Sequence, residues 1–361
     1  MLKFWKRQGK TVYILGAGVA GLAAAKEIKK KNPKNRVVVF EAKNHAGGRA
    51  FSYYNKTLDK IVDNATHVVL GCNKNIRSLM QVCEFEPSLK FWDGFHRQLY
   101  KEWWKCKDAI KVAIFNTPAR QIPWQMIKKV FFKLFPFNYD KRKIYYSHDN
   151  LTENLIEPLL TYADEVNYGY KIEKVETRKQ RIKSIMFENG KKQEIGEEDI
   201  VISALDAYAY EQIFRGKKFE FEKIITLTFR TSQPLFLPEN ARYFGIVNSV
   251  SQWLFKNYDI ISITISAAND LHISDEEIKQ EVWAFLSEMR HLKPAFMPPC
   301  QLFHHERATI KQDAYNNSLR PVSAKTSYSN LFIAGDWTVK DYPCCLETAV
   351  ISAKRAVKTA L

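Results

Sequence analysis

The stretch TVYILGAGVAGLAAAKEIKKK, residues 11–31, decides the fold of this 361-residue chain. Its first five residues are rich in β-branched and aromatic side chains and predict a strand, and its alanine-rich end predicts a helix. Three glycines with the spacing GxGxxG separate the two. Gly16 permits a tight turn, Gly18 lets the backbone approach a ligand phosphate, and Gly21 allows the helix to pack closely on the strand.

The second expected strand, RVVVFEA at residues 36–42, ends in a carboxylate. Glu41 lies twenty residues after Gly21, where a dinucleotide-binding fold places the acceptor for a ribose hydroxyl. The amides at the start of the helix would face the pyrophosphate. A chance glycine turn is the alternative, but strand, helix and carboxylate agree, so we predict a site for an adenine dinucleotide. The acidic residue argues against a 2′-phosphate, and FAD and NAD both remain open at this point.

Two further segments favour FAD. One is Gly47-Gly48-Arg49, and the other is NLFIAGD, residues 330–336, which predicts one more buried strand ending in an acidic residue. Both resemble segments of the flavoproteins with two dinucleotide-binding domains. The resemblance implies that Arg49 lies along the flavin and that Asp336 binds the ribityl and pyrophosphate region. A helix cap is the alternative role for Asp336.

The resemblance extends over most of the chain. The segments that carry it are DNATHVVLG (63–71), FNTP (115–118), LTENLIEPLL (151–160), QWLF (252–255), ERAT (306–309), Arg320-Pro321 and AGDWTVKDYPCCLETAV (334–350). In this order they resemble the amine-oxidase-type flavoproteins and, within that group, the hydroxysqualene dehydroxylases, which are relatives of the phytoene desaturases. The run of NTP, QW and ERAT is more specific to the dehydroxylases than the cofactor motifs are.

This resemblance implies an α/β fold: a three-layer, Rossmann-like FAD/NAD(P)-binding domain with a discontinuous α+β substrate domain. We expect the FAD-binding domain to comprise residues 1–71, 161–215 and 322–361, and the substrate-binding domain residues 72–160 and 216–321. The residues expected to bind FAD are Gly16, Gly18, Ala20, Gly21, Glu41, Ala42, Gly48, Arg49, Val175, Gly335, Asp336, Leu346 and Ala349.

Three departures from the family pattern concern the substrate and the flavin. The chain is shorter than usual, and the shortfall falls between Cys83 and Lys111, in the expected helical wall of the substrate domain. The residue before the histidine, usually Gln, is Thr66. The small Gly-Ala pair near the last helix is Thr348-Ala349. A threonine there would crowd a place where the backbone normally approaches the flavin ring.

The middle of the chain, residues 72–160, is expected to be mostly helical and aromatic. Residues 123–136 place apolar side chains at helical spacing and lysines on the other face. The apolar residues are Ile127, Val130, Phe131, Leu134 and Phe135, and the lysines are Lys128, Lys129 and Lys133. Such a helix either packs as an ordinary amphipathic core helix or lies in the interface of an anionic membrane.

Later segments alternate like strands. KIEKVET and RIKSIMFENGKK are expected to flank a turn at Asn189-Gly190, followed by the buried run IVISAL, and TLTFR and ISITISA are expected strands within residues 221–266. Ser274 and Glu277 predict a capping box before the helix EIKQEVWAFLSEM. The last helix is expected over residues 345–361, and by resemblance its N-terminus faces the flavin, where its dipole would stabilise the anionic reduced form.

The composition is that of an ordinary globular protein, with 46% hydrophobic and 26% charged residues. The net charge of +16 favours anionic partners, although scattered lysines on solvated faces explain it equally well, and nucleic acid is not the expected partner. Six cysteines show neither CxxC nor metal-ligand spacing. We therefore expect no metal site and a reducing cytoplasmic location, with contact to the inner face of a membrane left open.

The chemistry implied by the resemblance is that of a FAD-dependent oxidoreductase. Reduced flavin would deliver hydride to hydroxysqualene, an isoprenoid alcohol, as hydroxide leaves, and squalene would form. Loss of hydroxide needs a proton donor or charge stabilisation, for which His67, Glu306 and Arg307 are candidates. A structural hydrogen bond for His67 and an internal ion pair for Glu306 and Arg307 are the more ordinary interpretations.

Several alternatives remain open. Trp337 and Tyr342 would either wall the flavin or belong to the core. No second GxGxxG is present, so we expect an external electron donor. The same fold would also suit a phytoene-type carotenoid desaturase or an amine oxidase, which remove hydride instead of adding it. From another class, a non-catalytic FAD-binding relative would use a basic surface to bind membrane or nucleic acid.

Overall fold

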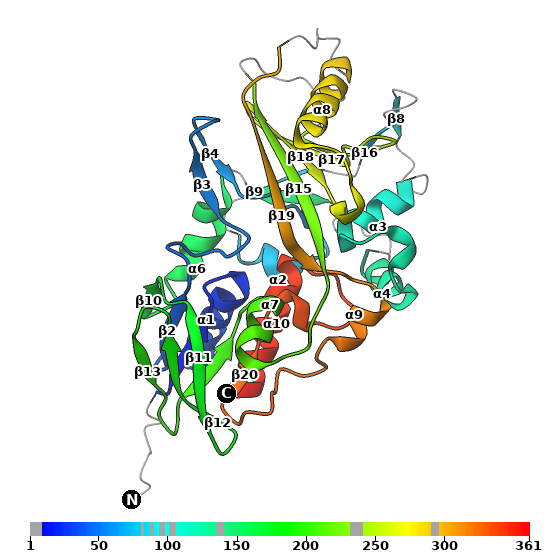
Figure 1. Cartoon of the computed structure of the whole chain (residues 1–361). Coiled ribbons are helices and arrows are strands. Elements are labelled where there is room, and N and C mark those ends of the chain that lie inside the picture. Colours follow the sequence, from blue (N-terminus) through cyan, green and yellow to red (C-terminus); the bar gives the residue numbers. More distant parts are fainter. Residues whose placement is uncertain are drawn as a thin grey trace, which may run out of the picture.

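The structure is a computed structural model in which two large sheets, one parallel and one mixed, dominate (Figure 1). The parallel sheet contains the glycine-rich turn, and the mixed sheet stands beside it. The residues described are 9–80, 83–86, 90–93, 98–100, 106–134, 141, 143–147, 149–231, 241–289 and 296–361.

Five strands form the parallel sheet, in the order β10-β2-β1-β14-β20. Strand β1 (Thr11–Leu15) lies between β2 (Arg36–Glu41) and β14 (Ile200–Ser203), and the edges are β10 (Glu165–Tyr168) and β20 (Leu331–Ile333). All four pairings are parallel, so the carboxyl ends of strands from distant parts of the sequence meet at one edge. The predicted strands at 11–15 and 36–41 and the buried run IVISAL are confirmed.

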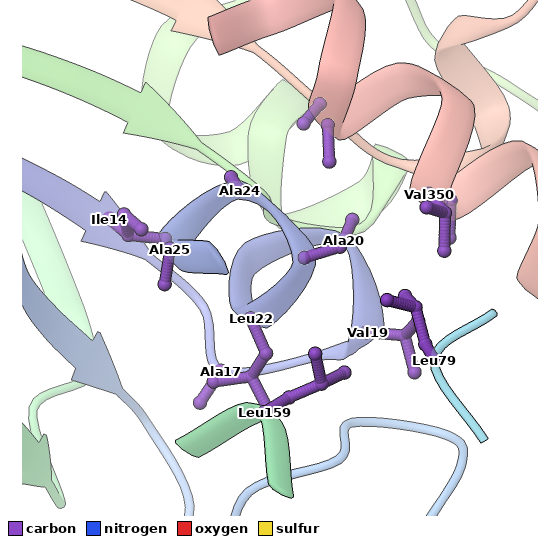
Figure 2. Close-up of a cluster of buried hydrophobic side chains, with 14 of the residues drawn as sticks. Ile14, Ala17, Val19, Ala20, Leu22, Ala24, Ala25, Leu79, Leu159 and Val350 are labelled. Atoms are coloured by element: carbon purple, nitrogen blue, oxygen red, sulfur yellow. The ribbon is translucent and has the colours of Figure 1, made fainter. Parts of the chain in front are cut away.

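Helices cover one face of this sheet and a small antiparallel sheet covers the other. Helix α1 (Val19–Lys31) packs on α10 (Leu346–Ala360), and Figure 2 shows Val19 of α1 beside Val350 of α10 and Leu79. The other face carries three strands, β11 (Ile172–Arg178), β12 (Arg181–Phe187) and β13 (Lys192–Glu194). The predicted three-layer arrangement and the final helix are therefore present.

The turn prediction for these strands needs a correction. Strands β11 and β12 are joined at Lys179-Gln180, where both residues have positive φ, at 50° and 53°. Asn189-Gly190 does form a turn, but it joins β12 to β13. Asn-Gly is the stronger sequence signal for a two-residue hairpin, so the prediction named Asn189-Gly190 as the turn. The turn between β11 and β12 is made instead by Lys179-Gln180, which are less typical turn residues.

Seven strands form the second sheet, in the order β19-β15-β18-β17-β16-β7-β8. Their bounds are Cys300–Ile310 (β19), Phe221–Arg230 (β15), Ile260–Ile265 (β18), Trp253–Asn257 (β17), Tyr243–Val247 (β16), Phe91–Asp93 (β7) and Gln98–Tyr100 (β8). The predicted strands TLTFR and ISITISA belong to β15 and β18, which confirms them.

Helix α8 (Asp275–Met289) covers one face of the seven-stranded sheet (Figure 1). Its buried Ile278 and Val282 belong to the same apolar cluster as Leu227 of β15. The predicted capping box is confirmed, because the Ser274 amide donates to Glu277 Oε2 at 2.7 Å and the Glu277 amide donates to Ser274 Oγ at 3.3 Å.

The segment 72–160 contains strands as well as helices, so the prediction that it is mostly helical is wrong in part. Strands of three or four residues are too short to show a period of two, and the sequence contains no other signal for them. The helices are α2 (Lys74–Arg77), α3 (Lys107–Phe115), η2 (Ala119–Gln121), α4 (Trp124–Leu134), η3 (Thr152–Ile156) and α6 (Glu157–Leu160), and the strands are β6 (Cys83–Glu86), β7, β8 and β9 (Ile144–Ser147).

The remaining elements complete the described chain. They are β3 (Ser52–Asn55), β4 (Lys60–Asp63), β5 (Val69–Leu70), α7 (Ala207–Phe214), η5 (Ala268–Asp270), α9 (Ala314–Leu319) and η6 (Asp336–Thr338). Within the described ranges, the structure contains no helix of the length and apolarity that crossing a bilayer requires.

The division into two domains stays a prediction. Leu155 and Leu159, from the segment assigned to the substrate domain, pack on the apolar core around α1 (Figure 2 shows Leu159 beside Leu22). Phe135 of the predicted amphipathic segment lies outside the described residues, and so do residues 87–89, 94–97 and 101–105 of the expected shortfall between 83 and 111.

Candidate functional site

The glycine-rich turn brings the backbone of α1 very close to β1. Gly16 has φ of +100°, in the region that favours glycine. A Cβ atom on Gly21 would lie 2.0 Å from the carbonyl oxygen of Gly16 and 3.1 Å from Ile14 Cγ2. Gly16 and Gly21 thus have the roles that the sequence predicted, since a larger residue at Gly21 would push the helix off the strand.

Gly18 differs from Gly21 because nothing in the protein crowds it. The nearest atom to a Cβ built there is the Cα of Gly48, at 3.9 Å. The two glycine clusters lie side by side, since Gly18 pairs with Gly47 in an isolated β-bridge and the Gly47 amide donates to the Ala17 carbonyl at 2.9 Å. The fold itself therefore does not require glycine at position 18. A glycine there is explained by the need to leave space for a ligand.

The first turn of α1 offers its amides to an anion. Gly18 is its N-cap, and no side chain of the described ranges caps the turn or places a carboxylate in it. Free amides and the positive end of the helix dipole together form a phosphate site. With the open space beside Gly18, this arrangement fits the pyrophosphate of a dinucleotide cofactor. Ala20 lies in this turn and is buried in the core.

Glu41 holds its carboxylate at the same turn. Its Oε2 accepts from the Ala17 amide at 2.8 Å and its Oε1 accepts from the Lys43 amide at 2.9 Å. The side chain is buried, whereas Ala42 beside it is exposed. The carboxylate is fixed at the end of β2 and bonded to Ala17, the residue between Gly16 and Gly18. This position suits a ribose hydroxyl.

Arg49 and Asp336 meet, although 287 residues separate them in sequence. Arg49 Nη2 donates to Asp336 Oδ1 at 2.7 Å, and Asp336 raises the pKa of Arg49. Nη1 donates to the carbonyl of Ala308, so Arg49 joins the two sheets. Arg49 stays 47% exposed at its side chain, which leaves part of the guanidinium free to contact a cofactor.

Gly335 precedes this aspartate in a conformation that favours glycine. Its φ is +135°, and its amide donates to Ser352 Oγ of α10 at 2.8 Å. Asp336 Oδ1 also accepts from the Trp337 amide at 3.1 Å, so the carboxylate binds both Arg49 and the local backbone, and its contact with the cofactor stays a prediction. Trp337 itself is buried and donates from Nε1 to the Leu205 carbonyl at 3.0 Å, which places it in the core.

The DNATH segment organises the backbone of Arg49. Asn64 Nδ2 donates to the Arg49 carbonyl at 3.2 Å, and His67 Nε2 lies 3.4 Å from the same oxygen. Burial lowers the pKa of His67 to about 4, so its imidazole is neutral at neutral pH. This geometry favours the structural interpretation of His67 over that of a general acid.

The structure does not bring Glu306 and Arg307 to His67. Glu306 is mostly exposed and pairs with Lys223 at 3.3 Å, and the Arg307 guanidinium lies 4.1 Å from the ring centre of Tyr208. The expected internal ion pair of these two residues is therefore wrong. The ERAT segment lies at a bulge in the β15–β19 ladder. Glu222 pairs with Thr309 and Ile224 pairs with His305, so Glu306 and Arg307 fall in the part of β19 that leaves the regular register.

The start of α10 accommodates the unusual threonine. Thr348 is buried, and its Oγ1 accepts from the Cys345 amide at 3.0 Å and donates to the Pro343 carbonyl at 2.8 Å. The hydroxyl is thus used inside the helix cap, and the crowding of the flavin ring stays a prediction. Leu346 is partly buried and Ala349 is buried in the α1–α10 core.

Two other predicted residues lie apart from this group. Val175 is in the middle of β11, packed on the face of the parallel sheet opposite α1. Tyr342 lies under a lysine, with Lys133 Nζ 4.3 Å from its ring centre. Within the described ranges no hydrogen bond or ion pair joins either residue to Glu41 or Arg49, so their predicted cofactor contacts remain predictions.

Sequence reasoning missed three side chains that face the Arg49 region. Phe303 and His305 lie on one face of β19, with their ring centres 6.4 Å apart, and the Phe303 ring meets Tyr53 of β3 edge-on at 6.1 Å. The period of two in QLFHHER was the available signal, because it sends His304 and His305 to opposite faces of a strand.

A glycine turn with an uncapped helix, a strand-terminal carboxylate and a joined Arg49–Asp336 pair define a dinucleotide-binding oxidoreductase. Two family models agree with this class. Residues 14–83 match the NAD(P)-binding Rossmann-like domain, and residues 127–361 match the flavin containing amine oxidoreductases. The chain belongs to the family of flavin-containing amine oxidoreductases, and it is a flavin-dependent oxidoreductase.

Known proteins resemble it over its whole length. The chain is 26% identical to the hydroxysqualene dehydroxylase of Zymomonas mobilis, covering 97% of this chain and 98% of that protein. It is also 26% identical to the hydroxysqualene dehydroxylase of Sinorhizobium fredii, with 98% of both chains covered. The crystal structure of an oxidoreductase from Methanosarcina mazei shares the fold, with a TM-score of 0.69 and 12% identity over 95% of this chain and 98% of that one.

The two glycines give a matched pair of tests. Gly18→Ala adds a methyl group where the protein has room but the expected pyrophosphate needs to lie, so flavin should be lost while the unfolding free energy stays within about 0.5 kcal/mol of wild type. Gly21→Ala should instead destabilise the fold by about 1–3 kcal/mol, because its Cβ overlaps the Gly16 carbonyl. Flavin absorbance and urea unfolding measure both effects. Retention of flavin by a folded Gly18→Ala protein would contradict the assignment.

Proposed function

We propose that this chain binds FAD and uses the reduced flavin to remove the hydroxyl group of hydroxysqualene, giving squalene. The observation that carries the proposal is the full-length likeness to hydroxysqualene dehydroxylases, which covers at least 97% of each chain. The alignment spans 419 positions although this chain has 361 residues, so those relatives contain segments that this chain lacks. The proposal therefore concerns the shared catalytic core.

The cofactor would lie across the carboxyl edge of the parallel sheet. The α1 amides beside Gly18 would hold the pyrophosphate, Glu41 would accept from a ribose hydroxyl, and Asp336 with Arg49 would hold the ribityl region. When bound, the flavin supplies hydride transfer. The open space at Gly18 and the uncapped α1 support this placement. The remaining work of the protein is to hold the substrate carbon close to the flavin and to exclude water.

The substrate would lie on the face of the seven-stranded sheet that α8 does not cover. We call this the inner face, and its residues are Ile224, Thr226 and Thr228 of β15, Ser262 and Thr264 of β18, and Gln301, Phe303 and His305 of β19. The β3–β4 hairpin packs over one end of it, where Leu58 and Val62 meet Ile260, while Phe303 keeps 37% of its surface accessible. Ile224 and Phe303 would contact an isoprenoid chain there, and the threonine, serine, glutamine and histidine side chains make the rest of the face polar.

Turnover under anaerobic conditions tests the proposal. Reduced holoenzyme mixed with hydroxysqualene should yield squalene, detected by mass, in an amount limited by the reduced flavin. Oxidised holoenzyme should leave hydroxysqualene unchanged, since it has no hydride to give. If reduced enzyme fails to convert hydroxysqualene and oxidised enzyme instead consumes phytoene or an amine, the desaturase or oxidase alternative replaces this function.

A further part of the proposal is contact with an anionic membrane through α4. Met126, Ile127 and Val130 pack on the core, which accounts for part of the predicted apolar face. Phe131, Phe132 and Trp124 are exposed on the same helix, and Phe132 keeps 62% of its surface accessible. Exposed aromatic side chains beside lysines are typical of interfacial helices.

The lysines of α4 support the same orientation. Lys128 lies 5.9 Å from the Phe132 ring centre and is exposed, so it can approach lipid headgroups with the aromatic residues. Lys129 pairs with Asp341 at 2.6 Å, and Lys133 lies over Tyr342. Through these contacts α4 joins the loop before α10, so a membrane bound at α4 would lie next to the proposed flavin site.

Vesicle sedimentation tests the membrane contact. The protein should bind phosphatidylglycerol vesicles more strongly than phosphatidylcholine vesicles, and binding should weaken as salt rises. The double change Phe131→Ser and Phe132→Ser should weaken it by at least about tenfold, because burying one Phe contributes roughly 1.5–3 kcal/mol. The control is Tyr258→Ser, which changes an exposed aromatic residue in the turn between β17 and β18, away from α4. Equal binding by the double variant and the control would refute α4 as the contact.

A further inference from the structure

Two polar side chains on the inner face lack the partners that buried polar groups normally have. Thr226 Oγ1 and His305 Nε2 are both buried, and neither forms a hydrogen bond with any described residue. Leaving a buried donor or acceptor without a partner costs about 1–3 kcal/mol, so such atoms are rare without a reason. Trp253 Nε1 is a third such atom in the same row across the sheet.

Strand register places these groups together. Ile224 is opposite His305 and Thr226 is opposite Phe303 in the β15–β19 ladder, so Thr226 and His305 are diagonal neighbours on one face. Thr226 is also opposite Thr264, which is opposite Trp253. The unpartnered atoms therefore form a polar strip on the inner face.

His304 and His305 are successive residues of β19, so their side chains point to opposite faces of the sheet. The neighbouring His304 points to the other face, where its Nε2 lies 2.7 Å from Asp275 Oδ1 of α8. His305 thus faces away from α8, toward Phe303 and the Tyr53 hairpin. Arg49 donates to the carbonyl of Ala308, three residues further along the same strand, so His305 lies on the part of β19 that meets the proposed flavin site.

The protonation state of His305 suits a hydrogen bond to an alcohol. Burial, with a smaller effect of the His304 charge, lowers the pKa of His305. The neutral imidazole carries one donor and one acceptor, so it matches a hydroxyl group and costs less to desolvate than an ion.

We infer that His305, together with Thr226, binds the hydroxyl group that the substrate loses. This inference rests on the proposed function, in which the substrate is a hydrocarbon with one hydroxyl. That hydroxyl is the one part of such a substrate that needs a polar partner, and within the mixed polar and apolar inner face Thr226 and His305 are the residues of β15 and β19 whose buried polar atoms lack one. His305 would then be a catalytic residue, since it touches the leaving oxygen.

The reaction balances with this role. The carbon–oxygen bond of the alcohol breaks and a carbon–hydrogen bond forms with hydride from the reduced flavin. The departing oxygen takes one proton from solvent and leaves as water, and His305 donates a hydrogen bond to it as negative charge develops. The flavin, oxidised by two electrons, is reduced again by an external two-electron donor.

Ligand preference separates this role from a structural one. Oxidised holoenzyme, which cannot turn over, is titrated with hydroxysqualene and with squalene, and binding is followed by flavin absorbance. Wild type should prefer the alcohol by roughly tenfold, the size of one net hydrogen bond. His305→Phe should bring the ratio close to one without weakening squalene binding, and should lower turnover roughly 10–100-fold. His305→Asn, which keeps a donor and an acceptor, should recover part of the preference.

Control variants keep the inference open to refutation. His304→Phe removes the neighbouring imidazole on the α8 face and should leave the ratio unchanged. Thr226→Val should reduce the preference without lowering the melting temperature, because the lost hydroxyl has no partner in the protein. The inference is overturned if His305→Phe and His305→Asn keep the wild-type ratio, or if His304→Phe loses it equally.

The same series distinguishes the two proposals. If wild type converts hydroxysqualene but the His305 variants match it in both ratio and turnover, the inference fails and the proposed function stands. If wild type neither prefers nor converts hydroxysqualene, the proposed function fails, and the role of His305 fails with it.

Discussion

The structure depends on the close approach of α1 to β1. The carbonyl of Gly16 lies where a Cβ on residue 21 would have to be, so the strand, the turn and the helix form a single rigid unit. That approach aims the first amides of α1 at the space beside Gly18, and no side chain in the described ranges competes for them. It also lets the alanine-rich surface of α1 pack on α10. The position of the phosphate site and the core of the parallel sheet thus have a common cause.

Arg49 connects this unit to the rest of the molecule. Its guanidinium binds Asp336 at the end of β20 and a carbonyl of β19, while its own carbonyl receives Asn64 and His67. One residue therefore fixes the parallel sheet, the seven-stranded sheet and the DNATH loop relative to each other. The bulge in β19 makes this possible, because residues that leave the regular ladder free the Ala308 carbonyl for Arg49.

The parts of the site that depend on local chemistry were predictable from sequence. Gly16, Gly21 and Glu41 act through backbone conformation and strand ends within one short segment, and spacing alone determines their roles. Arg49 and Asp336 were expected only through the family resemblance, because nothing local connects residues so far apart. His305 was missed, since its direction depends on the register of β19 against β15. The three- and four-residue strands of segment 72–160 were missed because their stability comes from neighbouring strands and not from their own pattern.

Every functional role proposed for this chain requires a flavin across the amides that follow β1. The absorbance of the purified native protein tests this, followed by denaturation and analysis of the released small molecule. We expect a yellow protein that releases about one FAD per chain without covalent attachment. A folded protein that is colourless and does not take up added FAD would contradict it.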